Sequence, residues 1–144
     1  MNRAKVILLA EDSLDDELAF KHALKHSGFD NHVIVVRDGD EAIAYLEGTG
    51  HFADRRRFPP PQVLVLDLIL PKRSGWQVLQ RLRSQSEFNE LFVVVLTGSL
   101  RAGDLKSAYD LGANSFLRKP CRPEDLAELA DGFPEHWTHA LVSF

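Results

Sequence analysis

Cysteine is nearly absent from this chain of 144 residues, in which Cys121 stands alone. An internal disulfide is therefore excluded, and this fits a reducing compartment, so we expect a cytoplasmic protein. No stretch approaches the roughly 20 apolar residues that a membrane-spanning helix needs. The first residues also lack the length and the small-residue cleavage site of a signal peptide. We therefore expect no membrane association.

An excess of basic charge is also missing. The 17 lysines and arginines are outnumbered by 21 aspartates and glutamates, for a net charge of -4. Nucleic acid is an unfavourable partner for such a chain, because binding to phosphates needs a basic face. What is present is ordinary globular composition, with 44% hydrophobic and 26% charged residues. A chain of this length buries enough apolar surface to fold without disulfides or a structural metal.

Five short apolar runs alternate with segments of helical periodicity. The runs predict strands at 5–10, 33–36, 63–66, 91–96 and 115–118, and the segments predict helices at 13–27, 40–47, 75–83, 102–111 and 123–132. The strands are apolar nearly throughout, which is typical of a parallel sheet covered on both faces. We therefore predict an α/β fold, a doubly wound five-stranded parallel sheet within a three-layer sandwich. This domain spans residues 1–132, and residues 133–144 form an apolar extension.

Polar residues follow the predicted strands where a doubly wound sheet places its ligand site. Glu11 and Asp12 follow the first strand, Asp67 the third, Thr97 the fourth and Lys119 the fifth. The first and third strands are neighbours in this topology, so three carboxylates should crowd together, and Mg²⁺ would relieve their repulsion. Lys119 can hold a phosphoryl oxygen, and Thr97 can donate its hydroxyl. The set suits phosphoryl transfer to a carboxylate nucleophile.

Four segments carry a resemblance to a known family. They read Leu-Leu-Ala-Glu-Asp-Ser at 8–13, Leu-Asp-Leu-Ile-Leu-Pro-Lys-Arg-Ser-Gly at 66–75, Val-Leu-Thr-Gly-Ser at 95–99 and Gly-Ala-Asn-Ser-Phe-Leu-Arg-Lys-Pro at 112–120. With these segments in order, each at a strand end, the chain resembles the response-regulator receiver domain. This CheY-like family has a flavodoxin-like (βα)5 sandwich, and the resemblance extends over residues 4–132.

The resemblance implies a phosphoacceptor site with a metal ion. Asp67 resembles the residue that takes a phosphoryl group from the phosphohistidine of a sensor histidine kinase. Asp12 resembles a direct ligand of Mg²⁺, and Glu11 resembles a ligand that acts through water. The backbone carbonyl of Ile69 would be a third metal contact. The side chain of Ile69 stands where polar residues are commoner, and it should face the mouth of the site.

The resemblance also implies a two-state switch. Lys119 would pair with the phosphoryl group, and its bond to Pro120 would be cis. Thr97 would move to bond a phosphoryl oxygen, and Phe116 would follow it inward. Phe116 stands where tyrosine is commoner, so its buried state needs no partner for a hydroxyl.

Two segments are similar to the stand-alone regulators of phytochrome-type histidine kinases. The first is the long loop at 48–62, and the second is the aromatic and apolar tail at 133–144. The tail should pack on its own domain or cover a neighbour through its large apolar residues, Trp137, Leu141, Val142 and Phe144. Since exposed apolar patches usually mark interfaces, we expect a homodimer.

The function predicted from these features is that of a single-domain response regulator in a two-component phosphorelay, with no enzymatic activity beyond slow self-dephosphorylation. The alternatives are a phosphate-independent protein-binding module and a phosphate sink for another regulator. Phosphatases of the haloacid-dehalogenase type need a second aspartate two residues after the nucleophile, where this chain has Ile69. A flavin or nucleotide binder would have a loop rich in glycine, serine or threonine after the first strand, where this chain is acidic.

Overall fold

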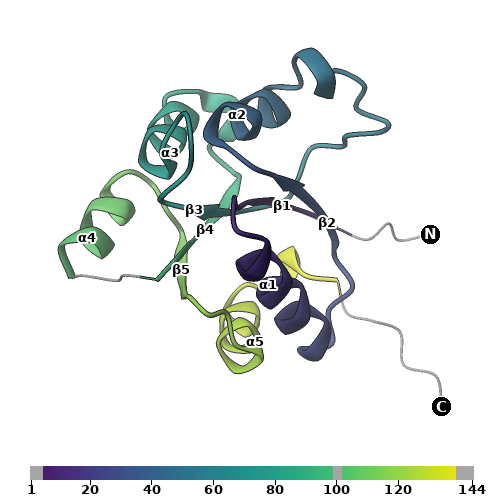
Figure 1. Ribbon diagram of the computed structural model, residues 1–144, viewed down its shortest axis with the longest axis vertical. Helices are drawn as coiled ribbons and strands as arrows, with labels where there is room; N and C mark the ends of the chain where they lie inside the picture. Colours follow the sequence, from purple (N-terminus) through teal and green to yellow (C-terminus); the bar gives the residue numbers. More distant parts are fainter. Residues whose placement is uncertain (1–4, 99–101, 139–144) are drawn as a thin grey trace.

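The computed structural model describes residues 5–98 and 102–138. Within these residues five strands alternate with five α-helices (Figure 1). In chain order they are β1 (Val6–Ala10), α1 (Leu14–His26), β2 (His32–Val36), α2 (Gly39–Glu47), β3 (Val63–Asp67), α3 (Gly75–Arg83), β4 (Phe92–Thr97), α4 (Ala102–Asp110), β5 (Ser115–Arg118) and α5 (Pro123–Gly132). No helix among these residues is long and apolar enough to cross a membrane.

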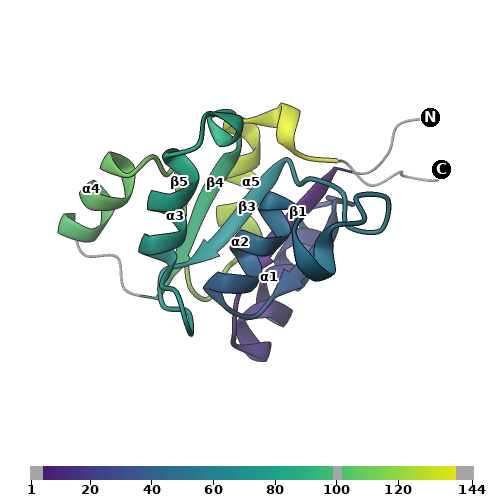
Figure 2. The same cartoon turned by 90° about the horizontal axis from the view of Figure 1, so that it is seen from above.

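The strands form one parallel sheet in the order β2-β1-β3-β4-β5. Helices α1 and α5 cover one face, and α2 and α3 cover the other (Figures 1 and 2). Successive side chains of a strand point to opposite faces. Leu64 and Leu66 accordingly join the cluster under α2 and α3, while Val63 and Val65 join the one under α1 and α5. The predicted three-layer fold is confirmed. Burial on both faces explains why the central strands β1, β3 and β4 are apolar nearly throughout, whereas the edge strands β2 and β5 are only partly buried.

Local capping residues set where the helices begin. The side chain of Ser13 accepts a hydrogen bond from the backbone N–H of Asp16 at the start of α1. Asp38 caps α2 in the same way, through the N–H of Glu41 at 2.8 Å. Such caps satisfy backbone donors that a helix cannot pair internally. Because α1 and α2 follow β1 and β2, these caps also place the helix starts at the carboxyl edge of the sheet.

The long connection between α2 and β3 is organised around Arg55. Its guanidinium donates hydrogen bonds to the carbonyl oxygens of Tyr45 at 2.7 Å, Leu46 at 3.0 Å and Phe58 at 3.1 Å. The hydroxyl of Tyr45 donates to the carbonyl oxygen of Pro59 at 2.8 Å. Arg55 therefore closes the C-terminal end of α2, where carbonyl oxygens lack helical partners, and ties the loop to it.

The first part of the tail packs against the domain. Trp137 is 3% exposed and belongs to the cluster under α1 and α5, with its ring 5.5 Å from that of Phe29. The hydroxyl of Thr138 accepts a hydrogen bond from the N–H of Lys5 at 2.8 Å, and its carbonyl oxygen accepts one from the N–H of Asp30 at 2.6 Å. The other large apolar residues of the tail, Leu141, Val142 and Phe144, lie outside the described residues.

Candidate functional site

Three carboxylates meet at the carboxyl edge of the sheet. Glu11 and Asp12 follow β1, and Asp67 is the last residue of the neighbouring strand β3. One oxygen from each carboxylate lies within 4.8 Å of the others. Because β1 and β3 pair in parallel, their ends coincide, and the strand order brings together residues that are 55 positions apart in the chain. The predicted convergence of these three residues is observed.

Lys119 stands between the carboxylates. Its Nζ atom lies 2.8 Å from Glu11 Oε2, 2.8 Å from Asp16 Oδ2 and 2.8 Å from Asp67 Oδ2. Burial acts to lower the pKa of Lys119, but the hydrogen bonds to these acids outweigh it and raise the pKa above its usual value. Lys119 is therefore a fixed positive charge against Asp67. The bond between Lys119 and Pro120 is cis, as the resemblance implied.

The acids differ in their exposure to water. Glu11 is fully buried and Asp67 is buried, whereas Asp12 is exposed. Burial raises the pKa of Glu11 to about 6, although hydrogen bonds from Lys119 and the Ser13 backbone act to lower it. Asp67 accepts the Ile69 backbone N–H on Oδ1 at 3.0 Å and the Lys119 ammonium on Oδ2. The exposed carboxylate of Asp12 can therefore contact ions in solvent, next to the buried carboxylates of Glu11 and Asp67.

The donor set fits a hard divalent cation. Glu11, Asp12 and Asp67 offer only carboxylate oxygens, which are the ligands that Mg²⁺ and Mn²⁺ prefer. The site holds four acids when Asp16 is counted, and their charges exceed the single positive charge of Lys119 by three. A divalent cation would offset most of this excess. The side chains would supply one to three ligands, and water or a phosphoryl oxygen would complete the shell.

Thr97 and Phe116 lie on the strands beside Asp67. Thr97 is the buried last residue of β4, which pairs with β3 on one side and β5 on the other. Phe116 is half-buried on β5 and packs on the cluster under α2 and α3. Its ring meets the ring of Tyr109 edge-on at 4.7 Å. Thr97 is therefore at the edge that holds the acids, whereas Phe116 lies one strand away against α4.

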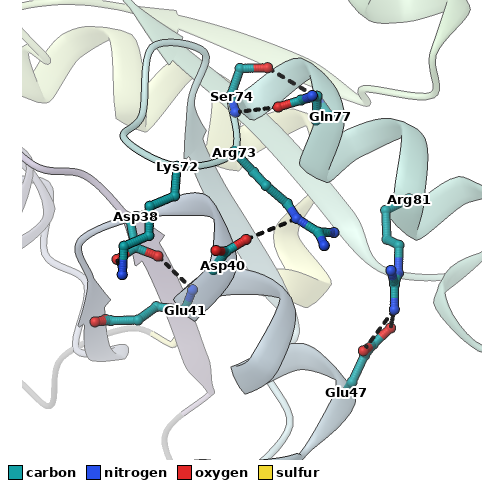
Figure 3. Close-up of polar contacts among 9 residues, drawn as sticks. All are labelled: Asp38, Asp40, Glu41, Glu47, Lys72, Arg73, Ser74, Gln77 and Arg81. Atoms are coloured by element: carbon teal, nitrogen blue, oxygen red, sulfur yellow. Dashed lines mark hydrogen bonds and ion pairs between the residues drawn. The ribbon is translucent and has the colours of Figure 1, made fainter.

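The loop from β3 to α3 follows Asp67 and is held by the start of α2 (Figure 3). Lys72 Nζ lies 3.5 Å from Asp38 Oδ2, and Arg73 Nε lies 2.8 Å from Asp40 Oδ1. The N–H of Gly39 donates to the carbonyl oxygen of Pro71 at 3.2 Å. Lys72, Arg73 and Asp40 are exposed, whereas Asp38 is buried. Ion pairs with exposed members contribute little energy individually, but together with the backbone bond these two set the path of the loop.

Glycine is required at two close backbone contacts of this loop, one with the start of α3 and one with the start of α2. A Cβ atom on Gly75 would lie 2.2 Å from the carbonyl oxygen of Asp67, and one on Gly39 would lie 2.1 Å from that of Arg73. Both distances are far below a normal contact, so a side chain at Gly75 would displace the backbone of Asp67 itself. The intervening Ile69 is 78% exposed, and its place at the mouth of the site stays a prediction.

Three further ion pairs at or beside the site escaped prediction from the sequence. Asp16 pairs with Lys119, and the buried Glu17 pairs with Arg37 at 2.5 Å and with Lys21 at 2.6 Å. Arg37 also donates to the backbone carbonyl of Glu11 at 3.4 Å. A local signal exists for Asp16, since it lies in the acidic first turn of α1, four residues after Asp12. No local pattern predicts that Glu17 pairs with Arg37 or that Asp16 pairs with Lys119, because these partners lie on other elements.

Comparison with known proteins gives a consistent family match. The family model of the response regulator receiver domain matches residues 7–131. The chain is 36% identical over 141 residues to the response regulator Rcp1 of Synechocystis sp. (strain ATCC 27184 / PCC 6803 / Kazusa), which covers 98% of this chain and 94% of Rcp1. The Mn²⁺-bound structure of Rcp1 matches with a TM-score of 0.75 over 96% of this chain and 97% of that one, at 35% identity.

Two further solved structures are similar over nearly the whole chain. The phosphorylated cyanobacterial phytochrome response regulator RcpA is 35% identical, with a TM-score of 0.77 and 94% of each chain covered. The bacteriophytochrome response regulator AtBRR is 35% identical, with a TM-score of 0.83, and the match covers 99% of this chain and 100% of that one.

Proposed function

The chain belongs to the response regulator receiver domain family, and from this premise we propose that Asp67 accepts the phosphoryl group. The protein is a response regulator of a two-component system, a phosphoacceptor. The observation that carries the assignment is the position of Asp67. It is a buried carboxylate 2.8 Å from a lysine ammonium and within 4.8 Å of two further acids.

The proposed transfer is a displacement at phosphorus. A carboxylate oxygen of Asp67 forms a bond to phosphorus, the bond from phosphorus to the kinase imidazole nitrogen breaks, and its electron pair stays on that nitrogen. Lys119 donates a hydrogen bond to a phosphoryl oxygen, and Thr97 offers a hydroxyl from the adjacent strand. Glu11, Asp12, Asp67 and the Ile69 carbonyl would hold Mg²⁺, which would supply positive charge to the phosphoryl oxygens.

We assign the switch to Thr97 and Phe116. Movement of Thr97 toward the phosphoryl group would free space beside β5, and Phe116 would turn inward to fill it. Its edge contact with Tyr109 on α4 would then change. The surface around α4 and β5 would differ between the two states and so select partners.

The proposed phosphate donor is a phytochrome-type histidine kinase in the cytoplasm. The similarity to RcpA and AtBRR over nearly the whole chain supports this assignment. We also propose that the chain forms a homodimer. Light scattering after size exclusion tests this on the full chain and on a chain cut after Thr138, which keeps the buried Trp137. A single-protomer mass for both would contradict the dimer.

Intact mass spectrometry after incubation with Mg²⁺ and acetyl phosphate tests the phosphoacceptor. The wild type should gain the mass of one phosphoryl group, and Asp67→Asn should not. Asp131→Asn, which removes an exposed carboxylate from α5, should behave as the wild type. Absence of an adduct on the wild type would instead favour the phosphate-independent binding module.

A further inference from the structure

Asp16 stands beside the proposed phosphoacceptor site without belonging to its metal cluster. It lies in the first turn of α1, and its Oδ2 atom is 2.8 Å from Lys119 Nζ across 103 positions of the chain. Among the described residues, the acids whose oxygens gather for a metal are Glu11, Asp12 and Asp67. Asp16 is one-third exposed, whereas Lys119 is 15% exposed, so the pair lies at the rim of the site.

The Lys119 ammonium has three protons and faces three carboxylates, each at 2.8 Å. Two of these partners change during the proposed reaction. Asp67 would serve a bound cation as a direct ligand and Glu11 would serve it through water, and Asp67 would become an acyl phosphate whose carboxyl group no longer carries a negative charge. Asp16 takes part in neither change, so it is the one partner that can hold Lys119 throughout.

A lysine ammonium needs a partner to fix its position, because its four-carbon chain is flexible and its three N–H donors can rotate. When Glu11 and Asp67 turn to the cation, an unheld ammonium would swing toward solvent. Tied to Asp16, it stays where the phosphoryl oxygens develop charge in the transition state. Positioning of this kind lowers the barrier, because the charge needs no reorganisation as the reaction proceeds.

We propose that Asp16 is a positioning residue that holds the Lys119 ammonium against the reacting phosphoryl group and thereby sets the rate of transfer to Asp67. The inference rests on the proposed function of Asp67. It adds a fourth acid to the site, one that acts through Lys119 and touches neither the phosphoryl group nor the metal.

The test compares Asp16→Asn with Asp15→Asn. Both substitutions remove one negative charge from the same turn of α1, but Asp15 is exposed and takes no part in the Lys119 contacts. The rate of phosphorylation at saturating acetyl phosphate and Mg²⁺ should fall about fivefold for Asp16→Asn, the value of one well-placed ion pair. It should stay unchanged for Asp15→Asn, and Asp16→Glu should recover part of the loss.

A second readout does not depend on phosphorylation. Acylation of lysine amines by an activated ester, quantified by peptide mass spectrometry with Mg²⁺ present, should label Lys119 faster in Asp16→Asn than in the wild type. The exposed Lys25 serves as the internal reference. A merely structural role would instead lower the stability of Asp16→Asn to urea and leave relative labelling unchanged.

The outcomes separate this inference from the proposed function. If the wild type is phosphorylated and Asp16→Asn matches it in both rate and labelling, the role of Asp16 is wrong and Asp67 keeps its assignment. If the wild type takes no phosphate, the assignment of Asp67 fails and the effect of Asp16 on transfer fails with it. In that case faster labelling of Asp16→Asn would still establish that Asp16 holds Lys119.

Discussion

Replacing Lys119 by methionine removes the positive charge that three acids share, and its cost should depend on pH. At 2.8 Å, unit charges attract by about 6 kcal/mol at an effective dielectric constant of about 20. The desolvation of Lys119 offsets much of this attraction. Removal of one member of a buried ion pair costs about 3–5 kcal/mol in general. Because Lys119 and Asp16 are partly exposed, we expect the lower end, about 3 kcal/mol at neutral pH.

Part of this loss belongs to Glu11 and can be separated by pH. With its pKa at about 6, ionised Glu11 is favoured over the protonated form at pH 7 by only about one pKa unit, on the order of 1 kcal/mol. This value is the upper limit on the unfolding free energy that Lys119→Met loses through Glu11, because Glu11 can bind a proton when its lysine partner is missing. In Lys119→Met the folded pKa of Glu11 rises further, so the folded state binds more protons than the unfolded chain and stability falls as pH rises.

The assay is urea unfolding of the wild type and Lys119→Met, without metal, at about pH 5 and about pH 7. The difference in unfolding free energy should widen by about 1 kcal/mol from the lower pH to the higher, and saturating Mg²⁺ should narrow this difference at neutral pH. Lys25→Met, an exposed change on α1, should cost under about 0.5 kcal/mol at either pH. A difference for Lys119→Met that is below about 1 kcal/mol at neutral pH, or equal at both pH values, would refute the reasoning.

Four further outcomes are expected. Gly75→Ala should abolish phosphorylation by acetyl phosphate, measured by intact mass, because its Cβ atom would lie 2.2 Å from the Asp67 carbonyl oxygen. Trp137→Ala should lower the unfolding free energy in urea by about 3–5 kcal/mol, because it empties a buried site. Burial, with the charge of Asp125, raises the pKa of Cys121 to about 12, so iodoacetamide at about pH 8 should label the native protein at least about 100-fold more slowly than the unfolded chain. The affinity for Mg²⁺, followed by calorimetric titration, should fall as pH drops through about 6, because Glu11 then binds the competing proton.

The sequence alone was sufficient for the layers of the fold and the edge that holds the site. Both follow from information within a few residues of each position. A run such as Val63–Asp67 is apolar at every position but the last, which predicts a strand buried on both faces that ends at a polar site. Helix starts such as Ser13 are set by hydrogen bonds to residues three positions away, so they too can be predicted from the sequence.

The tertiary structure decided which charges meet. Asp16 and Lys119 pair across 103 positions, and Arg37, which follows β2, pairs with Glu17 on α1. These contacts depend on the strand order and register, and on side-chain directions that no local pattern encodes. The same holds for Trp137, whose aromatic character indicated burial but whose place against Phe29 follows from the packing of α1 and α5. Local residues thus determined the elements and the chemistry at their ends. The strand order and register of the sheet determined which of those groups contact one another.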